Sequence, residues 1–134
     1  MSGVLIVGDL LYGFQPLADE VPPAQIKAWK LPQGASLPSI LVTRVSRTEQ
    51  QFLAEQEMRL VTERVQVTVN AASGASREAI LKLVRRACAG KLGVIAGFTG
   101  VAVLLAGGGP DFMDDAASIF MGSTDLRVSF NEPA

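Results

Sequence analysis

Hydrophobic and polar residues alternate along several stretches of this chain, a pattern typical of β-strands with one buried face. The clearest stretch is 60–69, in which one side carries Val61, Val65, Val67 and Val69, and the other carries Thr62, Arg64, Gln66 and Thr68. Residues 126–130 alternate in the same way, with Leu126, Val128 and Phe130 on the apolar side. We therefore predict two half-buried strands in these ranges.

Two other stretches predict strands by composition. Residues 39–47 are rich in β-branched side chains, which favour extended backbone. Residues 101–106 form a continuous apolar run that ends at the glycine cluster Gly107–Gly109 and Pro110. A short extended segment is expected at 26–31, and a further hairpin arm at 119–121.

One amphipathic helix is expected at 76–90. Its apolar positions recur at helical spacing and are Ile80, Leu83, Val84, Ala87 and Cys88. Ser76 is a suitable N-cap and Gly90 a suitable stop. We expect this stripe to pack on the sheet as core. Residues 4–14 suit a short helix, although Val4–Val7 alone also fits a strand.

Proline-rich and polar segments separate these elements. Pro16, Pro22 and Pro23 argue against regular structure from 15 to 24. Residues 48–58 are polar apart from Phe52 and Leu53, and fit either a helical turn or a mobile hairpin tip. Such a long connection between strands favours a contact with a partner. Residues 111–117 read as an acidic loop.

These elements predict an α+β fold over a single domain, 1–134, with a mostly antiparallel sheet, one main helix packed on it and a short N-terminal helix. A chain of 134 residues, 49% of them hydrophobic, can bury one core without disulfides. No internal repeat or linker divides it.

Composition removes several kinds of chemistry. The chain has no histidine, so it lacks the commonest general base and metal ligand. Its single cysteine cannot form a disulfide within the chain, which fits a reducing compartment. A net charge of −1 gives no global attraction to nucleic acid or anionic lipid. We expect a soluble protein made in the cytoplasm, without a signal peptide or a membrane span, and without a cofactor or metal.

Two clusters of residues suggest a phosphate site and a cation site, but their sequences favour an ordinary turn and a solvated loop. The Gly107–Gly109 cluster follows a strand, but Pro110 and Asp111 replace the GK[ST] ending of a phosphate loop, so a turn is favoured. Asp111, Asp114 and Asp115 lack the ligand spacing of a calcium loop and fit a solvated loop.

Three features keep two readings open. Glu63 lies on the apolar side of 60–69, either because the strand end is already in solvent or because it meets a neighbouring subunit. Trp29 is either a core anchor, which we favour, or an interface residue. Lys82, Arg85 and Arg86 form a basic edge on the predicted helix, which is either simply solvated or a surface that binds nucleic acid.

The order of the elements resembles that of the bacteriophage tail-completion proteins, also called tail terminators or tail-to-head joining proteins. The pieces that carry the resemblance are LPSILV at 37–42, LVTERVQVTV at 60–69, SREAILKLVRRAC at 76–88 and DLRVSF at 125–130. It covers essentially the whole chain, but no single motif is specific. The apolar start and the long 48–58 segment depart from the family pattern.

The resemblance implies a non-enzymatic virion protein of the tail or neck. It implies a homohexameric ring that caps the tail tube, with the major tail tube protein and a head-closure or connector protein as partners. DNA would pass through the lumen without sequence readout, and no membrane would be involved.

Candidate contact residues follow from this reading. The candidates for subunit or tail contacts are Arg47, Gln50, Gln51, Phe52, Leu53, Glu55, Glu63, Asp111, Phe112, Asp114 and Asp115. Lys82, Arg85 and Arg86 are candidates for a lumen or exposed basic face. If 46–58 is a contact arm, Phe52→Ala should weaken assembly and leave the melting temperature nearly unchanged.

Two other hypotheses remain open at this point. One is another neck or tail component, such as a head-closure or tube-like protein. The other is a small enzyme or ligand-binding domain. Size in solution separates the virion proteins from the third hypothesis.

Overall fold

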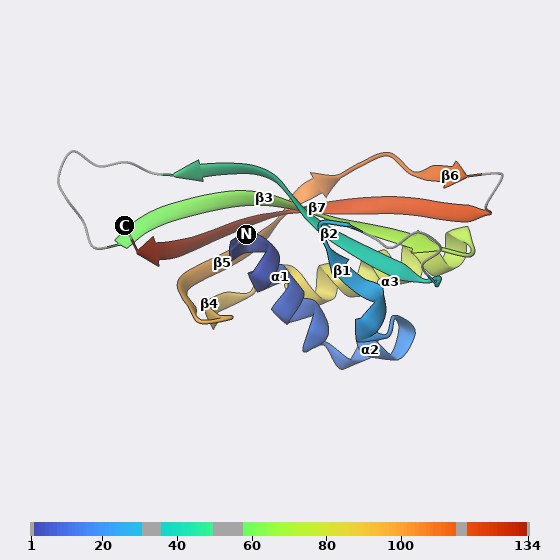
Figure 1. Cartoon of the computed structure of the whole chain (residues 1–134), viewed down its shortest axis with the longest axis horizontal. Helices are drawn as coiled ribbons and strands as arrows, with labels where there is room; N and C mark the ends of the chain where they lie inside the picture. The colour runs from blue at the N-terminus through green and yellow to red at the C-terminus, as the bar shows by residue number, and fades with distance from the viewer. Residues whose placement is uncertain (1, 31–35, 50–57, 115–117, 134) are drawn as a thin grey trace.

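A curled sheet runs through the computed structural model of this chain, with helices packed on one of its faces (Figure 1). The structure describes residues 2–30, 36–49, 58–114 and 118–133. Within these, the strand order is β1-β2-β3-β7-β5-β4, and β6 pairs with β7 beside the end of β5. All pairs are antiparallel except β1 with β2. The predicted α+β class with a mostly antiparallel sheet is confirmed.

The elements have the following bounds. The strands are β1 Ile26–Ala28, β2 Ser39–Glu49, β3 Met58–Ala71, β4 Leu92–Ile95, β5 Phe98–Gly108, β6 Phe112–Asp114 and β7 Ile119–Pro133. The helices are α1 Ser2–Tyr12, α2 Gln15–Glu20 and α3 Gly74–Cys88, with a 3₁₀ turn η1 at Pro23–Gln25.

The long pair of β3 and β7 forms the middle of the sheet. Their register runs without a break from Met58 opposite Pro133 to Ala71 opposite Phe120. The predicted alternation is confirmed on both strands, because the predicted apolar positions are buried against the helices. The two predicted ranges are therefore parts of longer strands, and the predicted 119–121 arm is the beginning of β7.

The β4–β5 hairpin was not predicted. Its strands are joined by Ala96 and Gly97, which both have positive φ, 53° and 82°. A two-residue turn with this backbone matches the twist of antiparallel strands. The expected acidic loop at 111–117 is also wrong in part, because Phe112–Asp114 form β6 on the edge of β7.

Helix α3 starts slightly earlier than predicted. The cap is Ser73 rather than Ser76: the Ser76 backbone N–H donates to Ser73 Oγ over 3.1 Å. Gly90, with φ at 76°, lies just beyond the helix end as predicted. The buried side chains of α3 are Ile80, Leu81, Val84, Ala87 and Cys88. Leu81 thus belongs to the core stripe, whereas Leu83 is only partly buried at its edge.

The N-terminal region is more regular than the prolines suggested. The predicted helix is α1, but the expectation of no regular structure from 15 to 24 is wrong. Pro16 lies in the first turn of α2, where a missing N–H has no intrahelical partner to lose. The short extended segment predicted at 26–31 is confirmed only over Ile26–Ala28, which form β1, because Trp29 has a positive φ of 70°.

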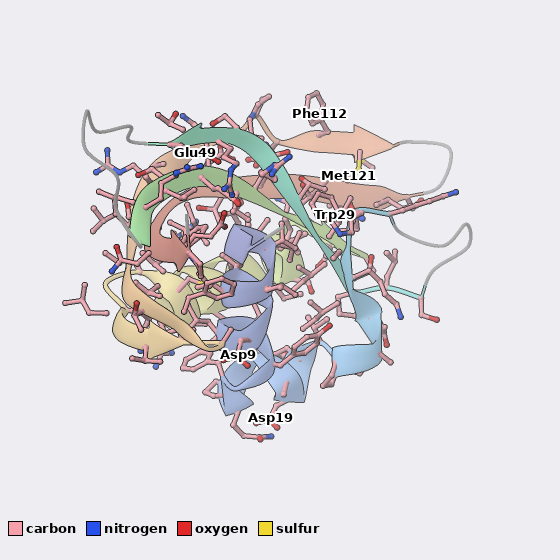
Figure 2. All side chains as sticks on the ribbon, turned by 60° about the vertical axis from the view of Figure 1, so that its left-hand side comes forward. Asp9, Asp19, Trp29, Glu49, Phe112 and Met121 are labelled. Atoms are coloured by element: carbon pink, nitrogen blue, oxygen red, sulfur yellow. The ribbon has the colours of Figure 1, made fainter. Side chains whose placement is uncertain are left out.

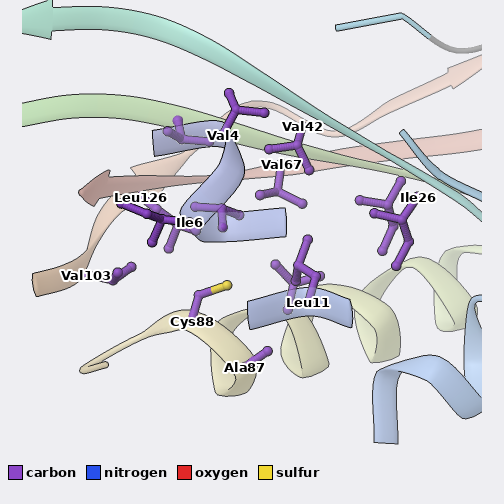
Figure 3. Packing of buried hydrophobic residues seen from close by; sticks show 14 of the residues in the cluster. Val4, Ile6, Leu11, Ile26, Val42, Val67, Ala87, Cys88, Val103 and Leu126 are labelled. Carbon is purple, nitrogen blue, oxygen red and sulfur yellow. The ribbon is translucent and has the colours of Figure 1, made fainter. Parts of the chain in front are cut away.

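The core lies between the inner face of the sheet and the helices. Figure 3 shows Ile6 and Leu11 of α1, Cys88 of α3 and Val67 of β3 pointing into the same interior. Because α1 lies across the curled sheet and contacts both β2 and α3, it closes one side of this core.

Candidate functional site

A polar network crosses the outer face of the sheet, opposite the helices. Arg64 Nε on β3 donates to Asp125 Oδ2 on β7 over 2.8 Å, and Arg64 Nη2 donates to the Ala106 carbonyl over 3.0 Å. Gln66 Nε2 donates to Asp125 Oδ1 over 3.3 Å. These contacts join three neighbouring strands and hold Asp125 at 7% exposure. Sequence alternation identified the face but not these pairs, which depend on the register.

A second network lies where β2 ends and β3 begins. Arg47 Nη2 donates to Glu49 Oε1 over 2.8 Å and to Glu132 Oε1 over 2.7 Å. Arg59 Nη1 reaches Glu49 Oε2 over 3.0 Å. The hydrogen bond that Arg47 donates to Glu132, followed by the one it donates to Glu49, raises the pKa of Arg47, and the hydrogen bond from Arg47 lowers the pKa of Glu49. Arg47, a predicted contact residue, is thus held by its own chain.

Glu63 corrects a sequence interpretation. Its side chain is fully buried, so the reading of a strand end in solvent is wrong. The backbone N–H of Gly3, at the start of α1, donates to both carboxylate oxygens over 3.3 and 3.4 Å. Arg47 Nη1 lies 3.7 Å from Glu63 Oε1. A carboxylate at a helix N-terminus is favourable because the first N–H groups lack partners there. A side chain enclosed in this way does not fit direct contact with another subunit either.

We predict that Glu63→Ala lowers the free energy of unfolding by about 1–3 kcal/mol, because it leaves the buried Gly3 N–H without this acceptor. Urea unfolding of the two proteins measures the difference. Glu78→Ala is the matched control, because Glu78 is 57% exposed on α3. We expect the control to stay within about 0.5 kcal/mol of the parent. Equal losses in both variants would contradict the capping role.

The candidates near β6 divide into described and undescribed residues. Asp111 Oδ2 pairs with Arg77 Nη2 of α3 over 3.3 Å. Phe112 is 58% exposed and points away from the helices (Figure 2). Asp114 ends β6, with its backbone opposite Ile119. Gln50, Gln51, Phe52, Leu53, Glu55 and Asp115 lie outside the described residues.

The predicted basic edge of α3 is not one uniform surface. Lys82 and Arg86 are exposed, whereas Arg85 is partly buried. The Arg86 guanidinium carbon lies 5.6 Å from the centre of the Phe14 ring, within the range of a cation–π contact. The structure therefore leaves Lys82 and Arg86 as the accessible cations of this edge.

Three large apolar side chains are exposed at positions where the sequence did not favour exposure. On β4, Leu92 and Val94 are 75% and 71% exposed. Trp29 is 46% exposed, so the preferred reading of a core anchor is wrong. The periodicity of a four-residue strand is too short to show which side chains face outward.

An open, mostly apolar groove lies between α1 and β1. Its volume is about 370 Å³, in the range of small binding pockets. Its lining residues are Val4, Leu5, Gly8, Asp9, Tyr12, Ile26, Lys27, Ala28, Val42 and Ala96. The Tyr12 hydroxyl donates to the Ile26 carbonyl over 3.0 Å and ties α1 to β1 at this groove.

The described residues contain no group of three or more acidic, cysteine or histidine side chains that could hold a metal. The glycine cluster also has local partners: Gly109 N–H donates to Ser123 Oγ over 3.1 Å. A Cβ at Gly108 would approach the Ser123 carbonyl oxygen to 2.9 Å, so this glycine permits close strand contact. The turn reading of the cluster is thus incomplete, because Gly107 and Gly108 end β5.

Cys88 is buried, and burial raises the pKa of its thiol to about 12. At pH 8 its thiolate fraction is then on the order of one in ten thousand. We predict that a thiol reagent leaves Cys88 unmodified in the native protein at pH 8 and labels it after unfolding in urea. Val45→Cys, at an exposed position of β2, is the control that should react at once. Rapid labelling of native Cys88 would contradict the buried placement.

No helix among the described residues is both long enough and apolar enough to cross a membrane. No protein-family model and no curated protein matches the chain. A solved structure does: a chain of "Virion of native gene transfer agent (GTA) particle" matches with a TM-score of 0.71 and 14% identity. The match covers 96% of this chain and 94% of that chain. At this identity the match shows that the two chains share a fold over nearly their whole lengths.

Proposed function

We propose that this chain is a non-enzymatic structural protein of a phage or phage-like virion. The observation that carries the proposal is the shared fold, over 96% of the chain, with a chain of a gene transfer agent virion. Because one fold can serve several functions, the surface must support the role independently. The described surface offers exposed strand edges and apolar side chains rather than a reactive cluster, which suits assembly with other subunits.

Within the virion, we propose that the chain completes the tail as a ring between the tail tube and the head connector. The finer role rests on the order of elements that resembles tail-completion proteins. In this arrangement, Asp111 and Phe112 at the β6 end contact a tail or head partner. Lys82 and Arg86 of α3 are available to face DNA in the lumen.

Deletion of the gene from a strain that makes the particles tests the role. We expect tails of irregular length or tails that remain unjoined to heads in negative-stain images, with rescue by the parent gene. Normal free tails would indicate head closure instead. Normal complete particles would contradict a structural role of any kind.

A symmetric reconstruction of the neck and tail end provides the second test. We expect density for a ring of this chain at the end of the tail tube. A well-resolved tail end without such a ring would exclude the tail-completion role, even if the protein were present elsewhere in the particle.

A further inference from the structure

The first turn of α1 is held by a side chain from β3. The backbone N–H of Gly3 donates to both carboxylate oxygens of Glu63, over 3.3 and 3.4 Å. The helix and the strand approach closely here, because a Cβ at Gly3 would come within 3.0 Å of Val65 Cγ2. The first turn of α1 contains no acidic residue of its own. Glu63 therefore supplies the negative charge that favours a helix N-terminus.

The sequence of α1 is a poor helix former. Its 11 residues include two glycines and three β-branched residues, which are Gly3, Gly8, Val4, Ile6 and Val7. Isolated helices shorter than about 12–15 residues are only marginally stable in water, even with better sequences. Contacts with the rest of the fold therefore maintain the helical backbone of α1. Loss of a contact at its start should open the first turn before the other elements open.

Arg47 connects this contact to the ends of β2 and β7, which continue past the start of α1 (Figure 1). One side of its guanidinium faces the buried carboxylate, with Nη1 3.7 Å from Glu63 Oε1. The other side donates from Nη2 to Glu132 Oε1 over 2.7 Å and to Glu49 Oε1 over 2.8 Å. The Glu63 side chain is fully buried, whereas those of Glu132 and Glu49 are 28% and 39% exposed. The two exposed carboxylates thus orient Arg47 toward the buried one.

We propose that Arg47 is a positioning residue that couples the ends of β2 and β7 to the first turn of α1. A buried carboxylate is costly unless a cation and hydrogen bonds compensate for its charge, and Arg47 provides that cation for Glu63. An interaction at the strand ends that draws Arg47 away removes this compensation and loosens the hold of Glu63 on Gly3. The inference goes beyond the proposed function, because it holds for any partner that contacts the strand ends.

Backbone amide exchange, followed residue by residue by NMR, tests the coupling. Arg47→Met removes the charge and keeps an apolar stem. We expect exchange in the first turn of α1 to become several-fold faster, while exchange in α3 and in the buried part of β3 changes little. Equal acceleration in all three elements would overturn the proposal, because it would show that α1 does not open as a separate unit.

Arg59→Met is the matched control, because Arg59 belongs to the same charged cluster. Its side chain is 43% exposed, and among the described residues it pairs only with Glu49, over 3.0 Å. The control therefore removes the same charge without removing a contact of Glu63. Exchange in α1 should stay close to that of the parent protein. An acceleration as large as that in Arg47→Met would overturn the specific role of Arg47.

The Glu63→Gln background shows whether Arg47 acts through the buried carboxylate. Glutamine keeps an oxygen that can accept from the Gly3 N–H, but it carries no charge that needs a cation. Arg47→Met should therefore cause no further acceleration of α1 exchange in this background. Acceleration by the same factor in both backgrounds would overturn the coupling, because Arg47 would then act on α1 without Glu63.

Glu132→Gln tests transmission from the end of β7. It replaces a charged acceptor of the 2.7 Å hydrogen bond from Arg47 with a neutral one, and hydrogen bonds between charged groups are about twice as strong as neutral ones. We expect exchange in α1 to become faster, by a smaller factor than in Arg47→Met, and this effect to vanish in the Glu63→Gln background. Unchanged exchange in α1 would overturn the coupling to β7.

Discussion

Replacement of Phe130 with alanine is expected to lower the free energy of unfolding by about 3–5 kcal/mol, the usual cost of removing a fully buried phenylalanine. Phe130 has no exposed surface and lies on β7 opposite Val61. Its ring meets that of Phe98 edge to face, with centres 5.4 Å apart and an angle of 64° between the planes. The variant therefore loses apolar burial, an aromatic contact and packing at the junction of β7 and β5.

Phe112→Ala is the matched control for this prediction, because Phe112 is 58% exposed on β6. Equilibrium urea unfolding should place the control within about 0.5 kcal/mol of the parent. If Phe112 contacts a virion partner, Phe112→Ala should keep this stability and also give fewer tails joined to heads. A large loss of stability in Phe112→Ala, or a small one in Phe130→Ala, would contradict the core assigned here.

The sequence specified the strands that have one apolar and one polar face. Phe130 is an example, since the alternation of 126–130 predicts that its side chain points inward. The pairing of β7 with β3 was not predicted and came from the structure. The length of these alternating stretches explains why the prediction succeeded. A longer alternating stretch is compatible with fewer other structures that bury the same residues.

The missed elements were short or depended on unusual backbone. β4 has four residues, and its turn places Ala96, which is not a glycine, at positive φ. α2 was missed because proline was read as a helix breaker, although the first turn of a helix accepts it. In both cases the local sequence permits the observed structure without requiring it.

Contacts between segments far apart in the chain could not be predicted from the sequence. Glu63 looked misplaced because the N-terminus of α1, its hydrogen-bond donor, lies 60 residues away in the chain. The groove has the same origin: α1, β1 and the β4–β5 turn meet there only through the fold. Candidate surfaces built from several elements therefore required the structure.

Helix α3 shows where periodicity alone misleads, and it yields the second large effect. Leu83 was expected in the core, but Leu81 is 3% exposed and lies over β7 at Gly122. A Cβ added at Gly122 would come within 3.0 Å of Leu81 Cδ1. We therefore expect Leu81→Ala to cost about 2–5 kcal/mol in urea unfolding, and Leu83→Ala clearly less.

A double-mutant cycle tests this contact further. Gly122→Ala alone should destabilise the protein, because its Cβ would also meet Arg77 Cδ at 3.0 Å and Asp111 Oδ1 at 3.1 Å. In the Leu81→Ala background one of these three close contacts is removed, and the new methyl group fills part of the cavity. The double variant should therefore be more stable than the sum of the single losses predicts, by about 0.5–3 kcal/mol, the range for residues in contact. Strict additivity would show that Leu81 does not pack on Gly122, and that α3 lies on the sheet in a different rotation, with Leu83 toward the core.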